Sequence, residues 1–141
     1  MKIEEIMTPA PQVISPGEPA SLAAGLMREF DVGMVPVCDG ERLLGVVTDR
    51  DIAIRLVAEG LDPSTTTVDR VMTREVIHCF HDESTEYAAA MMEDHQVRRL
   101  LVLNRNERLV GIVSLGDLAT RLYAPEVIAE TLEEISEPAT R

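Results

Sequence analysis

Apolar and polar residues alternate along this chain in a pattern that predicts the same series of elements twice. In the first half we expect a short strand before Ser15, a helix, two strands around a tight turn at Asp39–Gly40, and a second helix ending near Gly60. The expected bounds are 21–30 and 49–60 for the helices and 34–38 and 42–47 for the strands. The second half repeats this order, with strands at 76–79, 99–103 and 108–113 and helices at 84–95 and 115–123.

Both helices of the first half carry apolar stripes that we expect to face a core. These positions are Leu22, Leu26, Met27 and Phe30 in the first helix and Ile52, Leu56 and Val57 in the second. Methionines on helical faces fill irregular gaps well, and we interpret those of this chain as core residues rather than metal ligands.

Short identical pairs and a longer motif show that the two halves are copies of one unit. Met7–Thr8 recurs as Met72–Thr73, at an offset of 65, and Gly45–Asp51 recurs as Gly111–Asp117, at an offset of 66. The extra residue falls in the turn between the paired strands, where a duplicated fold tolerates an insertion. The chain is therefore an internal duplication.

The duplication divides the chain into four parts. We place the first repeat at 1–60, a linker at 61–70, the second repeat at 71–124 and an additional amphipathic helix at 125–141. That last helix carries an apolar stripe at Ile128, Leu132 and Ile135, which we expect to pack on its own module or on a second copy. The alternative is a docking helix for another protein.

Charge and composition exclude several classes of partner. The 141 residues are 45% hydrophobic, and 13 Lys and Arg against 25 Asp and Glu give a net charge of −12, which disfavours nucleic acid and anionic membranes as partners. No apolar run reaches the length of a membrane span and the first residues do not resemble a secretory signal, so we expect a cytoplasmic protein. Cys38 and Cys79 lie in apolar strands, where we expect buried free thiols.

The repeated junction between strand and helix carries a hydroxyl and a carboxylate three positions apart. Thr48 and Asp51, and again Ser114 and Asp117, match a helix capping box, although the acidic residue is the shorter Asp rather than the usual Glu. The same arrangement also suits a ribose phosphate, since a helix start attracts phosphate and a carboxylate accepts hydrogen bonds from a diol. Both interpretations remain open at this point.

Taken together, these motifs resemble the tandem CBS domain, named after cystathionine β-synthase, which occurs as a pair called a Bateman module. The resemblance covers about Met1 to Tyr123 and rests on "IMT" and "VMT" opening the halves, on "VGMVPVCDGERLLGVVTDRDI", and on "QVRRLLVLNRNERLVGIVSLGDL". It implies an α/β (α+β) fold of two pseudo-symmetric β-α-β-β-α repeats packed through their sheets, with clefts between the repeats that bind adenosine-containing ligands.

The resemblance also implies which residues contact such a ligand. Asp51 and Asp117 would hold ribose, Thr48 and Ser114 would lie near ribose or phosphate, and backbone around the first strand and the strand after the first helix would flank adenine. The candidate nucleotide-binding residues are Ile14, Ser15, Val32, Gly33, Met34, Val35, Pro36, Thr48, Arg50 and Asp51 in the first half and Cys79, Phe80, Val97, Arg98, Arg99, Ile112, Ser114 and Asp117 in the second.

Arg98 and Arg99 stand where similar modules carry a His-Arg pair that reaches phosphates, and the first half has Gly33 and Met34 there. Adjacent guanidiniums bind phosphate oxygens bidentately. The alternative is that one of them points to solvent and pairs with Glu93 or Asp94. Arg50 has Gly116 as its counterpart, so its charge belongs to the first motif alone.

Other clusters carry less chemistry. In "HCFH", Cys79 and His81 share one strand face, but two ligands do not make a metal site and we expect none. No nucleophile elbow, phosphate-binding loop or metalloprotease motif is present, so we expect no enzyme activity and no required cofactor.

The sequence thus predicts a stand-alone regulatory module and homodimer. It would bind AMP, ADP, ATP, S-adenosylmethionine or NAD between its repeats and pass occupancy to a protein partner. The alternative is an interaction or assembly module whose clefts stay empty or hold a metal.

Overall fold

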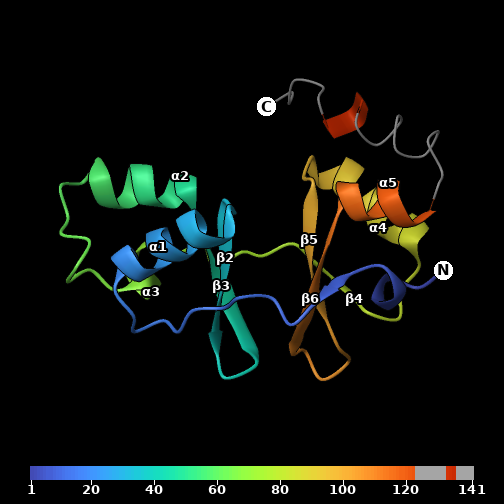
Figure 1. Cartoon of the computed structure of the whole chain (residues 1–141), viewed down its shortest axis with the longest axis horizontal. Coiled ribbons are helices and arrows are strands. Elements are labelled where there is room, and N and C mark those ends of the chain that lie inside the picture. Colours follow the sequence, from blue (N-terminus) through green and yellow to red (C-terminus); the bar gives the residue numbers. More distant parts are fainter. Residues whose placement is uncertain (123–132, 136–141) are drawn as a thin grey trace. The chain divides into compact units, whose positions relative to one another are not determined.

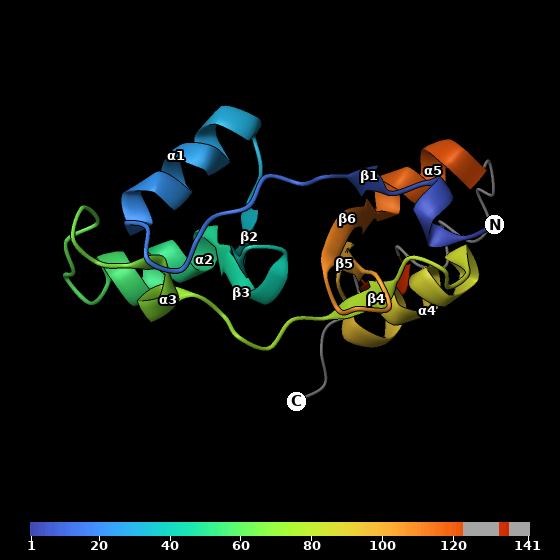
Figure 2. The same cartoon turned by 90° about the horizontal axis from the view of Figure 1, so that it is seen from below.

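The computed structural model describes residues 1–122 and 133–135, which form two compact units (Figure 1; Figure 2). Unit 1 contains Met1–Pro11 and the described residues of Ile77–Arg141, and unit 2 contains Gln12–Val76. The first eleven residues therefore fold with the second half of the chain. The predicted mixed α/β architecture of two similar units is confirmed.

Unit 1 is built on a sheet whose described strands lie in the order β1-β6-β5-β4. The strands are β1 (Thr8–Pro9), β4 (His78–Phe80), β5 (Arg99–Leu103) and β6 (Leu109–Ser114). β4 runs parallel to β5, and the other neighbours are antiparallel. Helices α4 (Thr85–His95) and α5 (Leu115–Leu122) and the short 3-10 helix η1 (Ile3–Glu5) complete the unit.

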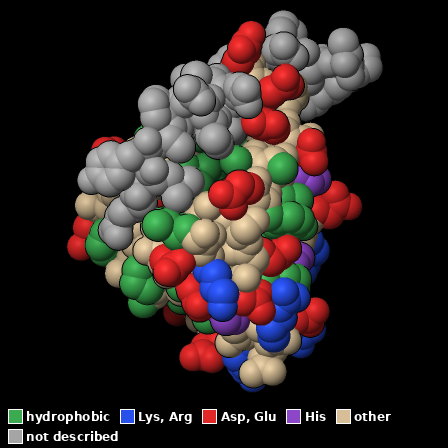
Figure 3. Space-filling model, turned by 90° about the vertical axis from the view of Figure 1, so that its right-hand side faces the viewer, with side chains coloured by type: hydrophobic (Ala, Val, Ile, Leu, Met, Phe, Trp, Pro, Cys, Tyr) green, Lys and Arg blue, Asp and Glu red, His purple; other side chains and the backbone are tan. Residues whose placement is uncertain are grey.

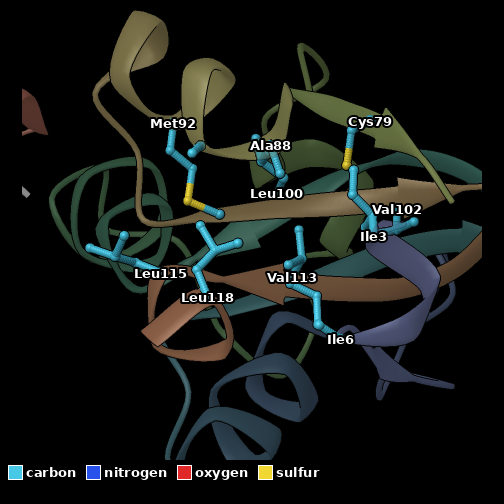
Figure 4. Close-up of a cluster of buried hydrophobic side chains, with 11 residues drawn as sticks. Ile3, Ile6, Cys79, Ala88, Met92, Leu100, Val102, Val113, Leu115 and Leu118 are labelled. Carbon is cyan, nitrogen blue, oxygen red and sulfur yellow. The ribbon is translucent and has the colours of Figure 1, made fainter. Parts of the chain in front are cut away.

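The core of unit 1 lies between the sheet and its helices, as Figure 4 shows. Leu100 of β5 and Val113 of β6 belong to the same cluster as Met92 of α4 and Leu118 of α5, and Val102 of β5 lies beside Ile3. Ile3 and Ile6 of the N-terminal segment are 0% and 1% exposed in the same cluster. By the alternation of strand side chains, Arg99, Leu101, Ile112 and Ser114 lie on the opposite face of the sheet.

Unit 2 repeats this plan with a two-stranded sheet of β2 (Met34–Asp39) and β3 (Arg42–Thr48). Its helices are α1 (Ala20–Phe30), α2 (Asp49–Asp51), which continues into the π-helical η2 (Ile52–Val57), and α3 (Val68–Val71). Its core includes Val35, Val37, Val47, Val68 and Val71. Residues 61–70, which the sequence suggests as a linker, thus contribute a buried valine to this core.

Several local features recur at corresponding positions of the two units. Asp31 ends α1 and Gln96 ends α4 in the left-handed conformation, with φ of 52° and 53°. A register shift also occurs in both hairpins, between Val37 and Cys38 and between Val102 and Leu103. The backbone therefore records the duplication that the sequence shows.

One difference between the units follows from a proline. β4 pairs with β5 over three residues, whereas the equivalent segment of unit 2 makes only an isolated bridge between Ile14 and Val37. The Pro36 carbonyl accepts a hydrogen bond from the Ile14 N–H (3.0 Å), but Pro36 has no N–H to continue the ladder toward Gln12. Leu101, its counterpart, has that N–H.

Two predicted helix faces differ from the structure. Val57 is 68% exposed, because η2 is π-helical and its wider turn leaves Leu56, and not Val57, facing the core. In α1, Leu22 and Phe30 are 42% and 44% exposed, because the small residues Ala20 and Ala23 face the core instead. The expectation that Val57, Leu22 and Phe30 point inward is wrong.

The predicted C-terminal helix at 125–141 lies mostly outside the described residues, as do Ile128 and Leu132. Residues 133–135 are helical, and Ile135 packs against the core of unit 1. Cys38 and Cys79 are free thiols and are buried, as predicted. Within the described part of the chain, every helix falls short of the length and apolar character that crossing a bilayer requires.

Candidate functional site

Both repeated junctions form capping boxes in the structure. Thr48 Oγ1 accepts a hydrogen bond from the Asp51 N–H, and Asp51 Oδ2 accepts one from the Thr48 N–H, each at 3.0 Å. In unit 1, Ser114 Oγ accepts from the Asp117 N–H at 3.0 Å and Asp117 Oδ2 accepts from the Ser114 N–H at 2.8 Å. The capping interpretation is confirmed in both repeats, and a second use of either aspartate depends on its remaining acceptor positions.

In unit 2 the Asp51 carboxylate has several further partners. Its side chain is 8% exposed, and the Thr73 hydroxyl lies 3.0 Å from Oδ1 and 3.1 Å from Oδ2. Arg55 Nε lies 3.7 Å from Oδ1, while Arg55 Nη1 donates to the Met72 carbonyl at 2.9 Å. Asp51 therefore joins the helix start to the Met72–Thr73 segment.

In unit 1 the Asp117 carboxylate differs in its partners. Asp117 is half-buried, and its Oδ2 accepts the capping hydrogen bond from the Ser114 N–H. Thr8, the counterpart of Thr73, is exposed and lies opposite Ile112 in the β1–β6 pair. Asp117 thus lacks the threonine contact that Asp51 makes with Thr73.

Arg98 and Arg99 lie beside this same helix start. Arg99 is the strand partner of Ser114, and the Arg98 carbonyl accepts a hydrogen bond from the Leu115 N–H at 2.9 Å. Both side chains are exposed. The fold therefore brings together Arg98, Arg99, Ser114 and Asp117.

The corresponding position of unit 2 has the opposite charge. The Gly33 carbonyl accepts a hydrogen bond from the Asp49 N–H at 2.9 Å, and a side chain at position 33 would meet Asp49 Oδ2 at 2.9 Å. The Asp49 carboxylate therefore lies beside the residue that corresponds to Arg98. Arg50 is exposed, and its backbone N–H donates to Asp49 Oδ1 at 2.8 Å.

The remaining candidates of unit 2 surround its helix start chiefly through backbone. Met34 is the strand partner of Thr48, and Pro36 is the partner of Val46. Ile14 and Val35 are buried in the core, and Val32 packs against it, so their side chains face other core residues. Ser15 is exposed, and its carbonyl accepts from the Glu18 N–H at 3.2 Å.

The remaining candidates of unit 1 are more spread out. Ile112 shares a sheet face with Ser114, and Val97 packs against the core. Cys79 pairs with Val102, and Phe80 pairs with Leu103. Leu103 lies four residues along β5 from Arg99, which is a separation of about 13 Å at the usual strand spacing. The strand register therefore does not place Phe80 beside the arginine pair.

Phe80 already has partners within unit 1. Its N–H donates to Glu83 Oε1 at 2.7 Å and its carbonyl accepts from the Glu83 N–H at 3.1 Å. The Arg105 guanidinium lies 4.4 Å from the centroid of its ring, and the ring of His78 meets it edge-on at 5.6 Å. A hydrogen bond from Arg105 in turn lowers the pKa of Asp82.

Burial governs the chemistry of both cysteines. Desolvation raises the pKa of Cys38 to about 11, and desolvation together with the nearby Glu83 carboxylate raises the pKa of Cys79 to about 12.

His81 Nδ1 lies 2.6 Å from Glu4 Oε2, so it contacts the N-terminal segment. Among the described residues, no three Cys, His, Asp or Glu side chains converge as metal ligands.

Sequence reasoning missed Thr73 and Arg55 as partners of Asp51. Two signals could have found them: Arg55 follows Asp51 by four positions, which is the spacing of a helical ion pair, and Thr73 belongs to the repeated Met-Thr pair.

Comparison with known proteins agrees with this architecture. The sequence profile of the CBS domain matches residues 3–58 and 68–124. The chain is 40% identical over 134 residues to the CBS domain-containing protein YhcV of Bacillus subtilis, covering 95% of this chain and 94% of that protein. It is 38% identical over 136 residues to Hypoxic response protein 1 of Mycobacterium tuberculosis, covering 95% and 93%.

Solved structures show the same fold. A crystal structure of Hypoxic Response Protein I with two coordinated zinc ions matches with a TM-score of 0.77 and 38% identity, over 86% of this chain and 98% of that chain. CBSX2 in complex with AMP matches with a TM-score of 0.75, over 89% and 98%, and its 24% identity shows the fold alone. The chain belongs to the CBS-domain family of regulatory modules.

Proposed function

We propose that this CBS module senses an adenine nucleotide or another adenosyl ligand, such as AMP, ADP, ATP, S-adenosylmethionine or NAD, and passes its occupancy to a protein partner. The ligand's ribose would bind a carboxylate at a repeated helix start, with phosphate near the hydroxyl and the arginine pair. The module would act in the cytoplasm as a homodimer. A ligand that binds two conformations with different affinities shifts the equilibrium between them, and a protein partner can respond to that shift.

One observation carries this proposal: Arg98 and Arg99 lie exposed beside the helix start that bears Ser114 and Asp117. On a chain of net charge −12, two adjacent guanidiniums form a local positive focus for phosphate. The AMP complex of CBSX2 shows that this fold can accommodate an adenosine ligand in that protein.

A second candidate is an interaction or assembly module whose ligand sites stay empty or hold a metal. Two observations favour it: both aspartates already cap their own helices, and the similar Hypoxic Response Protein I coordinates zinc. The two functions differ in what stabilises the purified protein.

A thermal-denaturation panel of AMP, ADP, ATP, S-adenosylmethionine, NAD and zinc chloride tests the proposal. A ligand present at about 100 times its dissociation constant adds about 2.7 kcal/mol to the stability of the folded state. We expect an adenosyl compound to raise the midpoint. A shift with zinc alone, or with none of the compounds, would favour the second candidate.

The arginine pair provides a variant that should not disturb folding, because both side chains are exposed. We expect Arg98→Gln/Arg99→Gln to remove most of the shift caused by AMP while leaving the midpoint without ligand unchanged. Arg28→Gln/Arg70→Gln removes the same charge from exposed positions of α1 and α3 and is the matched control. An equal loss in both variants would show a general charge effect instead of a phosphate contact.

A further inference from the structure

We infer that the outer helix layer of unit 2, formed by α1 and η2, binds the same layer of a second copy of the chain, whereas the corresponding layer of unit 1 does not. The inference rests on the homodimer of the proposed function but not on its ligand, so the two can fail separately. Identical surfaces that bind each other form a closed dimer with a twofold axis. The duplicated units would thus have diverged in their outer surfaces.

Both helices of unit 2 cover the same face of its two-stranded sheet. The buried cluster of this unit includes Ala23 of α1 and Leu56 of η2, together with Val35, Val37 and Val47 of the sheet. Val47 is the strand partner of Val35, and strand side chains alternate, so the three valines point to one side of the sheet. Figure 1 and Figure 2 agree in showing α1 and α2, which continues into η2, on one side of β2 and β3. The outward residues of the two helices therefore belong to one layer.

Four apolar side chains of this layer are exposed. Leu22 and Phe30 of α1 are 42% and 44% exposed, and Ile54 and Val57 of η2 are 51% and 68% exposed. A single exposed apolar residue is common on protein surfaces, whereas a group of them is typical of a binding surface. The layer would therefore gain stability from being covered.

The duplication provides an internal reference for this layer. Three of its positions have described counterparts in unit 1, and each counterpart carries a polar group: Tyr87 corresponds to Leu22, His95 to Phe30 and Thr120 to Ile54. These three residues are exposed as well. Since the two units share one plan, the plan itself does not require apolar side chains at these positions. A contact made by unit 2 with another surface accounts for them.

The charges on the helices favour a second copy as the occupant. The charged residues of α1 are Arg28 and Glu29, whose charges cancel, whereas α4 carries Glu86, Glu93 and Asp94. On a chain of net charge −12, a second copy is repelled less at α1 than at α4. In a twofold contact, Arg28 of one copy can also face Glu29 of the other. The layer of unit 2 is therefore self-complementary in charge and apolar between its charges.

Sedimentation velocity of the full chain without ligand tests the presence of the dimer. We expect a dimer, or an equilibrium of monomer and dimer, at micromolar concentrations. A chain that stays monomeric would overturn the inference, because its layer would then be covered by its own residues, by a different protein or by solvent. A dimer that binds no adenosyl compound would contradict only the proposed ligand, and a monomer that binds AMP would contradict only the dimer.

Ile54→Asp and Thr120→Asp test which unit makes the contact. They place the same charge at corresponding exposed positions of the two units. We expect Ile54→Asp to raise the dissociation constant of the dimer at least about 30-fold, because a twofold dimer carries the buried charge twice. Thr120→Asp should change it by less than about threefold. Equal effects, or a larger effect of Thr120→Asp, would overturn the assignment to unit 2.

The contact can also be located without a substitution. In amide nuclear magnetic resonance spectra of the wild-type dimer, a soluble nitroxide should broaden the signals of Tyr87 and Thr120 more than those of Leu22, Ile54 and Val57, which a second copy would shield. Equal broadening at both sets of amides, or stronger broadening at Leu22, Ile54 and Val57, would contradict the inference even if Ile54→Asp fails to fold.

Discussion

At the scale of single residues, the duplicated motif has two different environments. Asp51 is almost completely buried and is satisfied by a neighbouring backbone amide, a threonine and an arginine, whereas Asp117 is half-buried and has an exposed Thr8 where Asp51 has Thr73. Buried carboxylates need such partners, because an unpaired charge in a protein interior is costly. The two copies of the motif therefore lie in different environments, although each caps the start of its own helix.

Thr73→Val should destabilise the protein by about 1–3 kcal/mol, because the substitution keeps the side-chain shape but leaves the buried Asp51 carboxylate without its hydroxyl donor. Urea unfolding measures the change. Thr8→Val is the matched control at the corresponding exposed position, where we expect a change within about 0.5 kcal/mol. Equal effects of the two substitutions would show that the hydroxyl of Thr73 contributes nothing specific.

The two cysteines should be unreactive in the folded protein. Because burial raises their pKa values to about 11 and about 12, the reactive thiolate is much scarcer at pH 8 in the folded protein than in the unfolded chain. Stability linked to these thiols is present below the unfolded pKa near 9 and is lost as the pH rises toward the folded values. Reaction with Ellman's reagent at pH 8 should be slow without urea and fast with it; fast labelling of the native protein would disprove this burial.

At the scale of elements, two glycines allow the repeated Met-Thr segments to pack against the strands. A Cβ at Gly45 would lie 2.5 Å from the Thr73 carbonyl oxygen, and a Cβ at Gly111 would lie 2.5 Å from Met7 Sδ and 2.9 Å from the Thr8 carbonyl oxygen. Backbone atoms cannot move aside as a flexible side chain can. The glycine of the repeated motif is therefore a requirement of close approach in both units.

Gly45→Ala should cost about 1–3 kcal/mol through this overlap with the Thr73 backbone. Gly25→Ala, within α1, meets no atom within 4 Å and should stabilise the protein by about 0.5–1 kcal/mol, because alanine is the better helix former. Thermal or urea unfolding of the two variants provides the comparison. If Gly45→Ala is as stable as the wild type, the close approach at this position does not constrain the fold.

The sequence predicted the elements well where a local pattern determines them. The strands 34–38 and 99–103 and the helix 84–95 agree with β2, β5 and α4 to within a residue. It failed where the environment decides: the π-helical turn that exposes Val57 has no pattern of its own, and Thr73 lies twenty-two positions from the carboxylate it contacts. Periodicity shows which residues share a face, but not which distant segment covers that face.

At the scale of the whole molecule, the compact units do not coincide with the order of the chain. Met7–Thr8 opens the first repeat but packs on β6 of unit 1, and Met72–Thr73 opens the second repeat but pairs with Val46 of unit 2. Each repeat therefore completes the other's unit with its first segment.

Figure 3 shows that acidic side chains are scattered over one face of the molecule, while Lys and Arg gather toward its lower part. The many acidic side chains agree with the strongly negative net charge.

Ile6→Ala tests this exchange of segments. Ile6 is 1% exposed in the core of unit 1, so its truncation should cost about 2–5 kcal/mol. Hydrogen exchange should accelerate more at Leu100, Val102 and Val113 of unit 1 than at Val35 and Val47 of unit 2. Val13→Ala, at a position 42% exposed, is the control and should change stability by less than about 0.5 kcal/mol. Faster hydrogen exchange mainly in unit 2 would contradict the assignment of the N-terminal segment to unit 1.

Native mass spectrometry of the purified full chain shows whether this CBS module binds an adenosyl ligand, as we propose. The chain would be measured as purified and again after incubation with millimolar AMP, S-adenosylmethionine or NAD. We predict an added mass that corresponds to an adenosyl compound on the wild-type chain and that is reduced with Arg98→Gln/Arg99→Gln. A wild-type chain that carries no adenosyl compound under any of these conditions would contradict the account.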